Sequence, residues 1–139
     1  MEKALIDTDI WFDILRGVRP KVMEYADDYL ATHGNFTISA MTVAEFIRGI
    51  VRRHNPRILQ KWQEQMQSLE IIPVDAAVAE LTGTILARLD DLGTPIGSID
   101  PFVAATAIVH ERVLVTANTR HYQRIIDAGF ALRMANWRE

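Results

Sequence analysis

Residues 4–16 have the sequence ALIDTDIWFDILR, in which a short apolar run ends at Asp7 and a helical pattern follows. The run over residues 4–7 is typical of a buried strand. The apolar spacing over residues 10–16 predicts a helix, and Asp9 is of a residue type that caps helices. A strand that passes directly into a helix is the repeating unit of a parallel α/β sheet. In such sheets ligands bind beyond the carboxyl ends of the strands, where Asp7 lies.

The same alternation of short strands and helices continues along the chain. We predict further strands at residues 36–39, 71–72, 113–116 and 131–133. We predict helices at residues 21–31, 42–54, 102–111 and 120–128, another that begins near Pro56, and a long one between Asp75 and Gly93. We therefore expect one domain over residues 1–139, of the α/β class, with a central parallel sheet of four to five strands flanked by helices.

The composition limits the classes of function. The 139 residues carry a formal net charge of −3, so any nucleic acid must be held by local cations or by metal ions. The chain has no cysteine, which excludes disulfides, thiolate catalysis and cysteine zinc sites. We find neither a secretory signal nor an apolar stretch long enough to cross a membrane, so we expect a cytoplasmic protein with no membrane partner.

Three acidic residues lie at junctions between predicted elements. Asp7 ends the first strand, Glu45 lies near the start of the helix over residues 42–54, and Asp100 precedes the helix over residues 102–111. If the fold gathers these junctions, the carboxylates repel one another unless protons or cations compensate. Carboxylate oxygens are ligands that Mg²⁺ and Mn²⁺ prefer. The sequence therefore favours a divalent-metal site that hydrolyses a phosphodiester.

Each of these acids also has a purely structural interpretation. Asp7 fits a turn after the strand. Thr42 and Glu45 have the spacing of a capping box, in which the glutamate bonds the backbone N–H of the threonine. Asp100 precedes Pro101 and fits a helix N-cap. No single acid decides between the two interpretations, so the hypothesis of a site depends on the set.

Several segments of the chain resemble PIN-domain ribonucleases, most of all the VapC-type toxins of toxin–antitoxin pairs. The resemblance covers nearly the whole chain, and the order of the segments makes it specific. It rests on Leu5-Ile6-Asp7-Thr8-Asp9, Thr42-Val43-Ala44-Glu45 with Arg48-Gly49, Pro95-Ile96-Gly97 before Asp100, Ala104-Ala105-Thr106-Ala107, and Leu114-Val115-Thr116-Ala117-Asn118-Thr119-Arg120.

The resemblance implies an endoribonuclease whose Asp7, Glu45 and Asp100 bind Mg²⁺ (or Mn²⁺). Its implied partners are an RNA substrate, a cognate antitoxin protein that blocks the site, and a second copy of the chain in a homodimer. PIN domains often have a fourth acid where this chain has His121, whose imidazole suits Mn²⁺ better than Mg²⁺. An exposed position on the last helix is an equal alternative for His121. Asn118 is a further catalytic candidate, as a neutral oxygen ligand or as a residue that orients a water.

Other polar residues are candidates to support the site. Thr8 and Thr116 could orient the carboxylates by hydrogen bonds. For Arg52 and Arg53 we favour a solvated helix face over a role in binding. The candidates for holding RNA phosphates are Arg48, Arg16, Arg120 and Arg124.

Two other functions fit parts of the pattern. A catalytically weak PIN-like module that binds only RNA or protein is the main alternative, because His121 stands at the fourth position. A phosphoacceptor receiver domain is also a small α/β fold with acids after its strands. That fold needs a lysine after a late strand, and this chain has none beyond Lys61.

Overall fold

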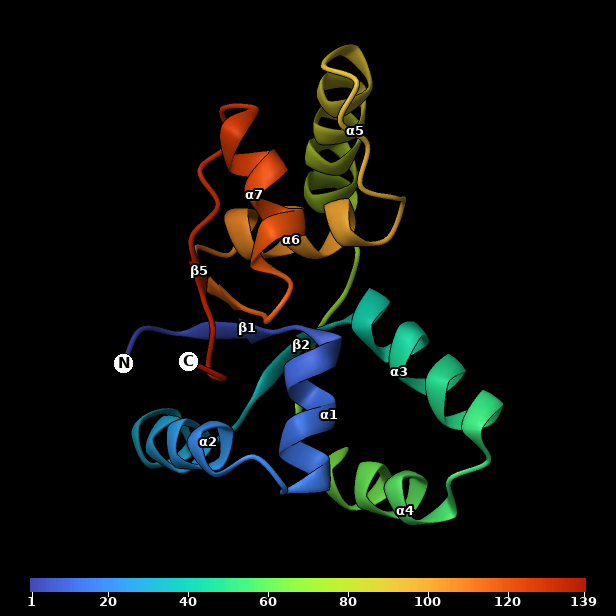
Figure 1. Cartoon of the computed structure of the whole chain (residues 1–139), viewed down its shortest axis with the longest axis vertical. Helices are drawn as coiled ribbons and strands as arrows, with labels where there is room; N and C mark the ends of the chain where they lie inside the picture. The colour runs from blue at the N-terminus through green and yellow to red at the C-terminus, as the bar shows by residue number, and fades with distance from the viewer.

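The computed structural model describes all 139 residues and contains seven helices and five strands (Figure 1). In chain order these elements are β1 (Ala4–Ile6), α1 (Thr8–Arg16), α2 (Pro20–His33), β2 (Thr37–Ser39), α3 (Ala40–Arg53), α4 (Pro56–Gln65), β3 (Glu70–Ile72), α5 (Ala76–Asp91), α6 (Asp100–Val109), β4 (Val113–Val115), α7 (Thr119–Asp127) and β5 (Met134–Ala135).

All strand pairs are parallel, and they form two separately hydrogen-bonded sheets, which we call ladders. One ladder has the order β1-β4-β5, and the other pairs β2 with β3. Strands β1 and β2 lie in contact, so the two ladders are neighbours. The predicted parallel α/β fold with flanking helices is therefore confirmed, with its five strands divided between two ladders.

The last strand lies three residues later than predicted. The carbonyls of Arg133 and Ala135 accept hydrogen bonds from the backbone N–H groups of Leu114 and Thr116, and β5 spans Met134–Ala135. The apolar character of residues 131–132 has a different cause, because Leu132 is buried in the core beside α7. The apolar side chains of residues 131–132 therefore suggested a strand too early in the chain, whereas the strand itself is defined by hydrogen bonding to β4.

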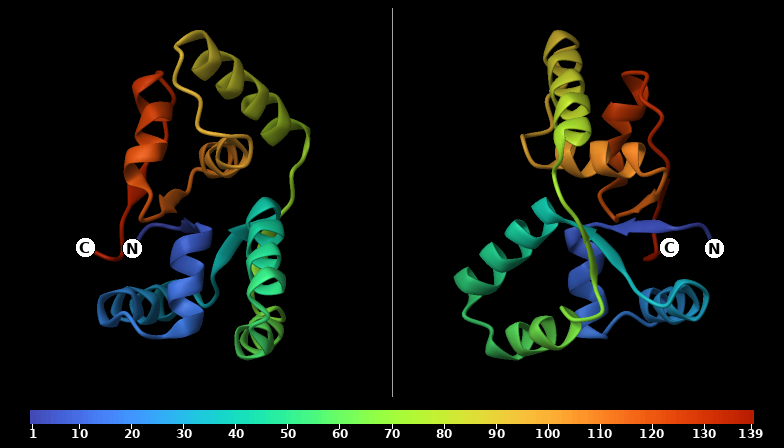
Figure 2. Two further views of the ribbon diagram at one scale, coloured as in Figure 1. Left: turned by 45° about the vertical axis from the view of Figure 1, so that its right-hand side comes forward. Right: turned by 180° about the vertical axis from the view of Figure 1, so that it is seen from behind.

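Helices cover both faces of the strands (Figure 2). Side chains of β1 alternate between the faces, as in any strand. Leu5 belongs to the core cluster built with α5, α6 and α7, whereas Ile6 belongs to the cluster built with α1 to α4. The carboxyl ends of β1 and β4 lead into α1 and α7 at one edge of the sheet. None of the helices is long and apolar enough to span a bilayer.

Three helix starts differ from the predictions. The N-cap of α1 is Asp7 rather than Asp9. Ser39 caps α3, accepting a hydrogen bond from the Met41 backbone at 3.0 Å, so α3 begins at residue 40. The capping-box hypothesis for Glu45 is wrong, because Glu45 lies in the second turn. Asp100 is the first residue of α6 rather than its cap.

One arginine connects the two ladders at their amino-terminal edge. Nη1 of Arg112 donates to the Ala4 carbonyl of β1 at 3.2 Å and to the Thr37 hydroxyl of β2 at 3.0 Å. Nη2 donates to Glu70 of β3 at 2.9 Å. These bonds span the junction at which β1 and β2 share no strand pairing.

Candidate active site

Asp7 stands at the carboxyl end of β1, and its carboxyl group is fixed by two donors. The Thr8 backbone N–H donates to Oδ1 and the Thr116 hydroxyl donates to Oδ2, each at 2.9 Å. Only 6% of the residue is exposed. Burial raises the pKa of Asp7 to about 7, with Asp9 and Asp100 adding to the rise and the two hydrogen bonds opposing it. Near neutral pH this carboxyl is therefore readily protonated.

Glu45 is brought to Asp7 by Thr8. The Thr8 hydroxyl donates to Oε1 of Glu45 at 2.8 Å, which joins the start of α1 to the second turn of α3. Burial raises the pKa of Glu45, and the charges of Asp100 and Asp9 raise it further. The Thr8 hydrogen bond and the charge of Arg48 act in the opposite direction. The side chains of Glu45, Asp9 and Asp100 are thus close enough to affect one another.

Asp100 pairs with His121 across the gap between α6 and α7. Nδ1 of His121 lies 2.8 Å from Oδ2 of Asp100 and 3.1 Å from the Asn118 side-chain amide. An N–H at Nδ1 can donate to the carboxylate, and Asn118 can then face that N–H only with its oxygen. The structure therefore places both His121 and Asn118 next to Asp100, with the His121 side chain 29% exposed.

Two further residues lie at this group of acids, and the sequence analysis missed both. The sequence predicts that Asp9 caps the first helix. In the structure its Oδ2 instead accepts a hydrogen bond from the Ala117 backbone N–H at 3.0 Å, which joins α1 to the segment after β4. Burial raises the pKa of Asp9. The hydroxyl of Tyr122 is fully buried and makes no hydrogen bond of normal length, although the Asp100 carboxylate is close enough to raise its pKa through a longer one. Burial raises its pKa well above 10, and Asp7 and Asp100 reinforce the rise.

The sequence contains a signal for only one of these two residues. Asp9 follows Asp7 by two residues at the junction of a strand and a helix, and ligands of parallel α/β sheets bind at such junctions. For Tyr122 no signal was available, because its burial depends on how α7 packs against the rest of the fold.

The predicted RNA-binding arginines are not all near the acids. Arg48 follows Glu45 on α3 and shares a hollow with it. Arg120 is exposed in the first turn of α7. Arg124 donates to the Pro95 carbonyl at 3.0 Å and ties α7 to the segment before α6. Arg16 is in the last turn of α1, about 13 Å along the helix from Asp7, so the expectation that it lies beside the site is wrong.

The donor set fits a hard divalent cation by its chemistry. Four acids lie close enough here to raise one another's pKa values, and among them only Asp100 forms an ion pair with a basic side chain, the imidazole of His121. However, no three of the chain's histidine, aspartate and glutamate side chains are already arranged to hold one ion. Thr8 and His121 each donate to one oxygen of a carboxylate, which leaves further lone pairs on Glu45 and Asp100 for an ion.

A family model described as the PIN domain matches residues 4–126 of the chain. The chain belongs to the PIN domain family. This PIN domain is 30% identical over 138 residues to the tRNA(fMet)-specific endonuclease VapC of Shigella flexneri, and 34% identical to the VapC of the same name from Salmonella typhimurium. Both alignments cover 99% of each chain. The crystal structure of DNA-bound VapBC from Salmonella typhimurium is similar in fold, with a TM-score of 0.79, 26% identity and 99% of each chain covered.

Proposed function

We propose that this PIN domain is a metal-dependent endoribonuclease and the toxin of a type II toxin–antitoxin pair. The observation that carries the proposal is the buried carboxyl of Asp7, grouped with Asp9, Glu45 and Asp100 and lacking a basic ion-pair partner. At neutral pH such a group is stable only when protons or a cation compensate the charge. The names of the relatives, ribonuclease and endonuclease VapC, support an activity on RNA.

Asp7, Glu45 and Asp100 would hold Mg²⁺ (or Mn²⁺), with His121 as a possible fourth ligand. When bound, such an ion lowers the pKa of a coordinated water and offsets charge on the phosphate. The chain's own contribution is orientation. Thr116 and Thr8 fix Asp7, and Thr8 also holds Glu45. Asn118, beside His121, is placed to orient a water.

The partners follow from the same relatives. Solved relatives are VapBC complexes, so we propose a cognate antitoxin that binds this chain. An RNA substrate and a homodimer complete the proposal. Because two relatives are named for tRNA(fMet), the initiator tRNA is the first RNA to test.

A catalytically weak module that binds RNA or protein is the second candidate. The pairing of His121 with Asp100 at 2.8 Å favours it, because the imidazole competes with an ion for the Asp100 carboxylate. The two candidates differ in one result, which is cleavage that depends on a divalent metal.

The decisive experiment is a cleavage-site map of total RNA with the purified chain in EDTA, Mg²⁺ and Mn²⁺. We expect specific cleavage only with metal, and none in Asp7→Asn or Asp100→Asn. Circular dichroism must show that both variants stay folded. Full cleavage by both variants would refute the proposed mechanism, and RNA binding without cleavage in any metal would favour the second candidate.

A further inference from the structure

The outer side of α3 carries a hollow of about 460 Å³ that opens beside the acids. It is lined by Glu45, Arg48, Gly49, Arg52 and Arg53, and by no hydrophobic side chain. Glu45 connects this hollow to the site, because its carboxyl accepts the hydrogen bond from Thr8, next to Asp7. We call these five residues the α3 hollow.

The three arginines of the α3 hollow form no ion pair, although the charge of Arg48 lowers the pKa of Glu45. None of the ion pairs in the structure includes Arg48, Arg52 or Arg53, and all three residues are exposed. The chain as a whole has a net charge of −3, whereas the hollow contains three arginines that form no ion pair. Its surface is therefore locally positive on a protein that is negative overall. Free guanidinium groups that line an open hollow indicate an anionic ligand.

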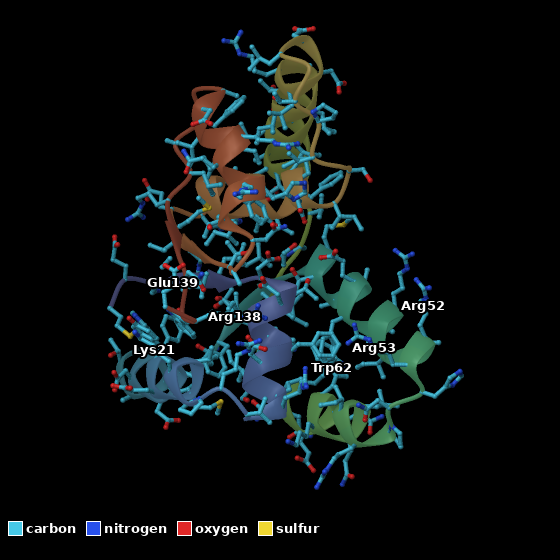
Figure 3. The ribbon with its side chains drawn as sticks, in the orientation of Figure 1. Lys21, Arg52, Arg53, Trp62, Arg138 and Glu139 are labelled. Carbon is cyan, nitrogen blue, oxygen red and sulfur yellow. The ribbon has the colours of Figure 1, made fainter.

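Arg53 is held in place by aromatic side chains. Its guanidinium lies 5.3 Å from the centre of the Phe12 ring, and this ring lies 4.6 Å from that of Phe46. In Figure 3 Arg53 turns toward α1, whereas Arg52 extends outward from α3. A cation–π contact restrains the guanidinium without neutralising its charge. Arg53 is therefore oriented in advance and remains able to bind an anion.

The spacing along α3 suits a chain of phosphates. Arg48 follows Glu45 by three residues, and Arg52 lies four residues, or about 6 Å, farther along the helix axis. One helical turn therefore separates neighbouring cations on the same side of α3. This separation is comparable to that between adjacent phosphates of an extended single strand. The cations lead away from the acids in one direction only, along α3.

We propose that the α3 hollow binds the backbone of single-stranded RNA on one side of the bond that is cut. Arg48 holds the phosphate nearest to the site, and Arg52 and Arg53 hold those beyond it. This inference rests on the proposed function, whose site supplies the cut. It assigns a binding role to Arg52 and Arg53, for which the sequence alone favoured a solvated helix face.

A protein ligand fits the α3 hollow less well than RNA. The buried core of a protein interface is more apolar than the rest of the surface, and this hollow has no hydrophobic side chain to form one. A separate hollow between α3 and α4 does have an apolar lining, with Ile47, Ile50, Val51 and Leu59. The lining of the α3 hollow instead has the composition that neutralises a polyanion.

The test is RNA binding without cleavage, measured by fluorescence anisotropy with a labelled single-stranded RNA in EDTA at several salt concentrations. The variants are Arg48→Gln, Arg52→Gln and Arg53→Gln, and the matched control is Arg57→Gln, an exposed arginine on α4 outside the hollow. Each hollow variant should lower affinity roughly five-fold and reduce the slope of log K against log salt by about 0.7. The control should change neither quantity. Unchanged affinity in all three hollow variants would overturn the proposal.

A second measurement addresses direction. RNAs shortened toward the cut from one end should lose affinity as the last two or three nucleotides before the cut are removed, and shortening from the other end should not. Arg52→Gln should reduce that loss, because Arg48 and Arg53 still hold their phosphates. An acidic peptide of glutamates is the competing probe. If the three variants weaken peptide binding but leave RNA binding intact, the hollow is a protein site and the inference is wrong.

Failure of this inference and failure of the proposed function are distinguishable. If the wild type cleaves RNA with metal and the arginine variants keep their RNA affinity, only the proposal that the α3 hollow binds RNA is refuted. Loss of RNA affinity in the variants, with no metal-dependent cleavage by the wild type, would refute only the nuclease and leave the hollow as an RNA-binding surface.

Discussion

At the scale of single residues, the site consists of polar groups placed where burial makes them unfavourable. Asp7 is 6% exposed and accepts hydrogen bonds from Thr8 and Thr116, yet its pKa is raised to about 7. The Tyr122 hydroxyl is buried with no hydrogen bond of normal length. Strained or unpaired groups of this kind persist at functional sites, where they cost stability. Both residues therefore allow sharp tests of stability.

We expect the metal-free protein to lose stability as the pH rises from about 4 to 7. The pKa of Asp7 is about 7 in the folded state, against an ordinary value of 3.8 for an aspartate, so the folded state binds the proton more tightly than the unfolded chain does. Its stabilisation is complete below the lower value and is lost through the upper one. Asp7→Asn should flatten this dependence and raise the free energy of unfolding at pH 7 by up to about 4 kcal/mol.

Urea unfolding in EDTA at several pH values measures this effect. The matched control is Asp90→Asn, an exposed aspartate of α5, whose pH profile should follow the wild type. If Asp7→Asn and the wild type keep parallel profiles between pH 4 and 7, the Asp7 carboxyl is ionised normally and the argument from its burial is wrong.

Two buried tyrosines should respond in opposite directions to loss of the hydroxyl. Tyr122→Phe removes a buried hydroxyl that makes no hydrogen bond of normal length and has only a long contact with Asp100, so it should raise the free energy of unfolding by up to about 1 kcal/mol. The Tyr29 hydroxyl accepts from the Ala4 backbone at 2.9 Å, so Tyr29→Phe should lower it by about 1–2 kcal/mol. Urea unfolding of the pair measures both changes, and equal effects of the same sign would contradict the assignment of partners.

At the scale of elements, tertiary contacts decided what local sequence left open. Ser39 and Thr42 are both residue types that cap helices, and the sequence favoured Thr42 because Glu45 follows it by three residues. In the structure Ser39 caps α3, and Glu45 instead accepts from Thr8 of α1. A contact between residues 8 and 45 has no local signature. The acids, their order and most helices were accessible from periodicity and junctions, whereas Tyr122 and the role of Asp9 depend on packing.

The start of α3 can be tested with a pair of substitutions. Ser39→Ala removes the hydroxyl that accepts from Met41 and should cost about 1 kcal/mol. The Thr42 hydroxyl is buried without a partner, so the isosteric change Thr42→Val should be neutral or stabilising. Thermal unfolding of both variants provides the comparison. If Thr42→Val lowers the stability more than Ser39→Ala does, Thr42 caps the helix after all, and Glu45 would then have only the structural role of a capping-box residue.

At the scale of the whole molecule, the site depends on how two ladders are held together. Asp7 and Thr116 follow β1 and β4 of one ladder, whereas Glu45 lies on α3, which leaves β2 of the other. The ladders meet where β1 touches β2 without pairing, and Arg112 bonds to β1, β2 and β3 at the opposite edge from the acids. A change in the relative position of the ladders would separate Glu45 from Asp7.

Loss of Arg112 should therefore destabilise the fold and loosen one ladder more than the other. The side chain is 12% exposed and donates to three acceptors, so Arg112→Met should lower the free energy of unfolding by about 2–3 kcal/mol. Arg133→Met is the control: this arginine is 51% exposed, and its loss should cost less than about 0.5 kcal/mol. Native-state hydrogen exchange identifies where the loss occurs. In Arg112→Met, amides of β2 and β3 should open at lower free energy than those of β1 and β4. The reason is that the pair β2–β3 is then attached to β1 only by side-chain packing. Equal loss of protection in both ladders would mean that β1 and β2 are joined by their side-chain core and that Arg112 adds stability without coupling them.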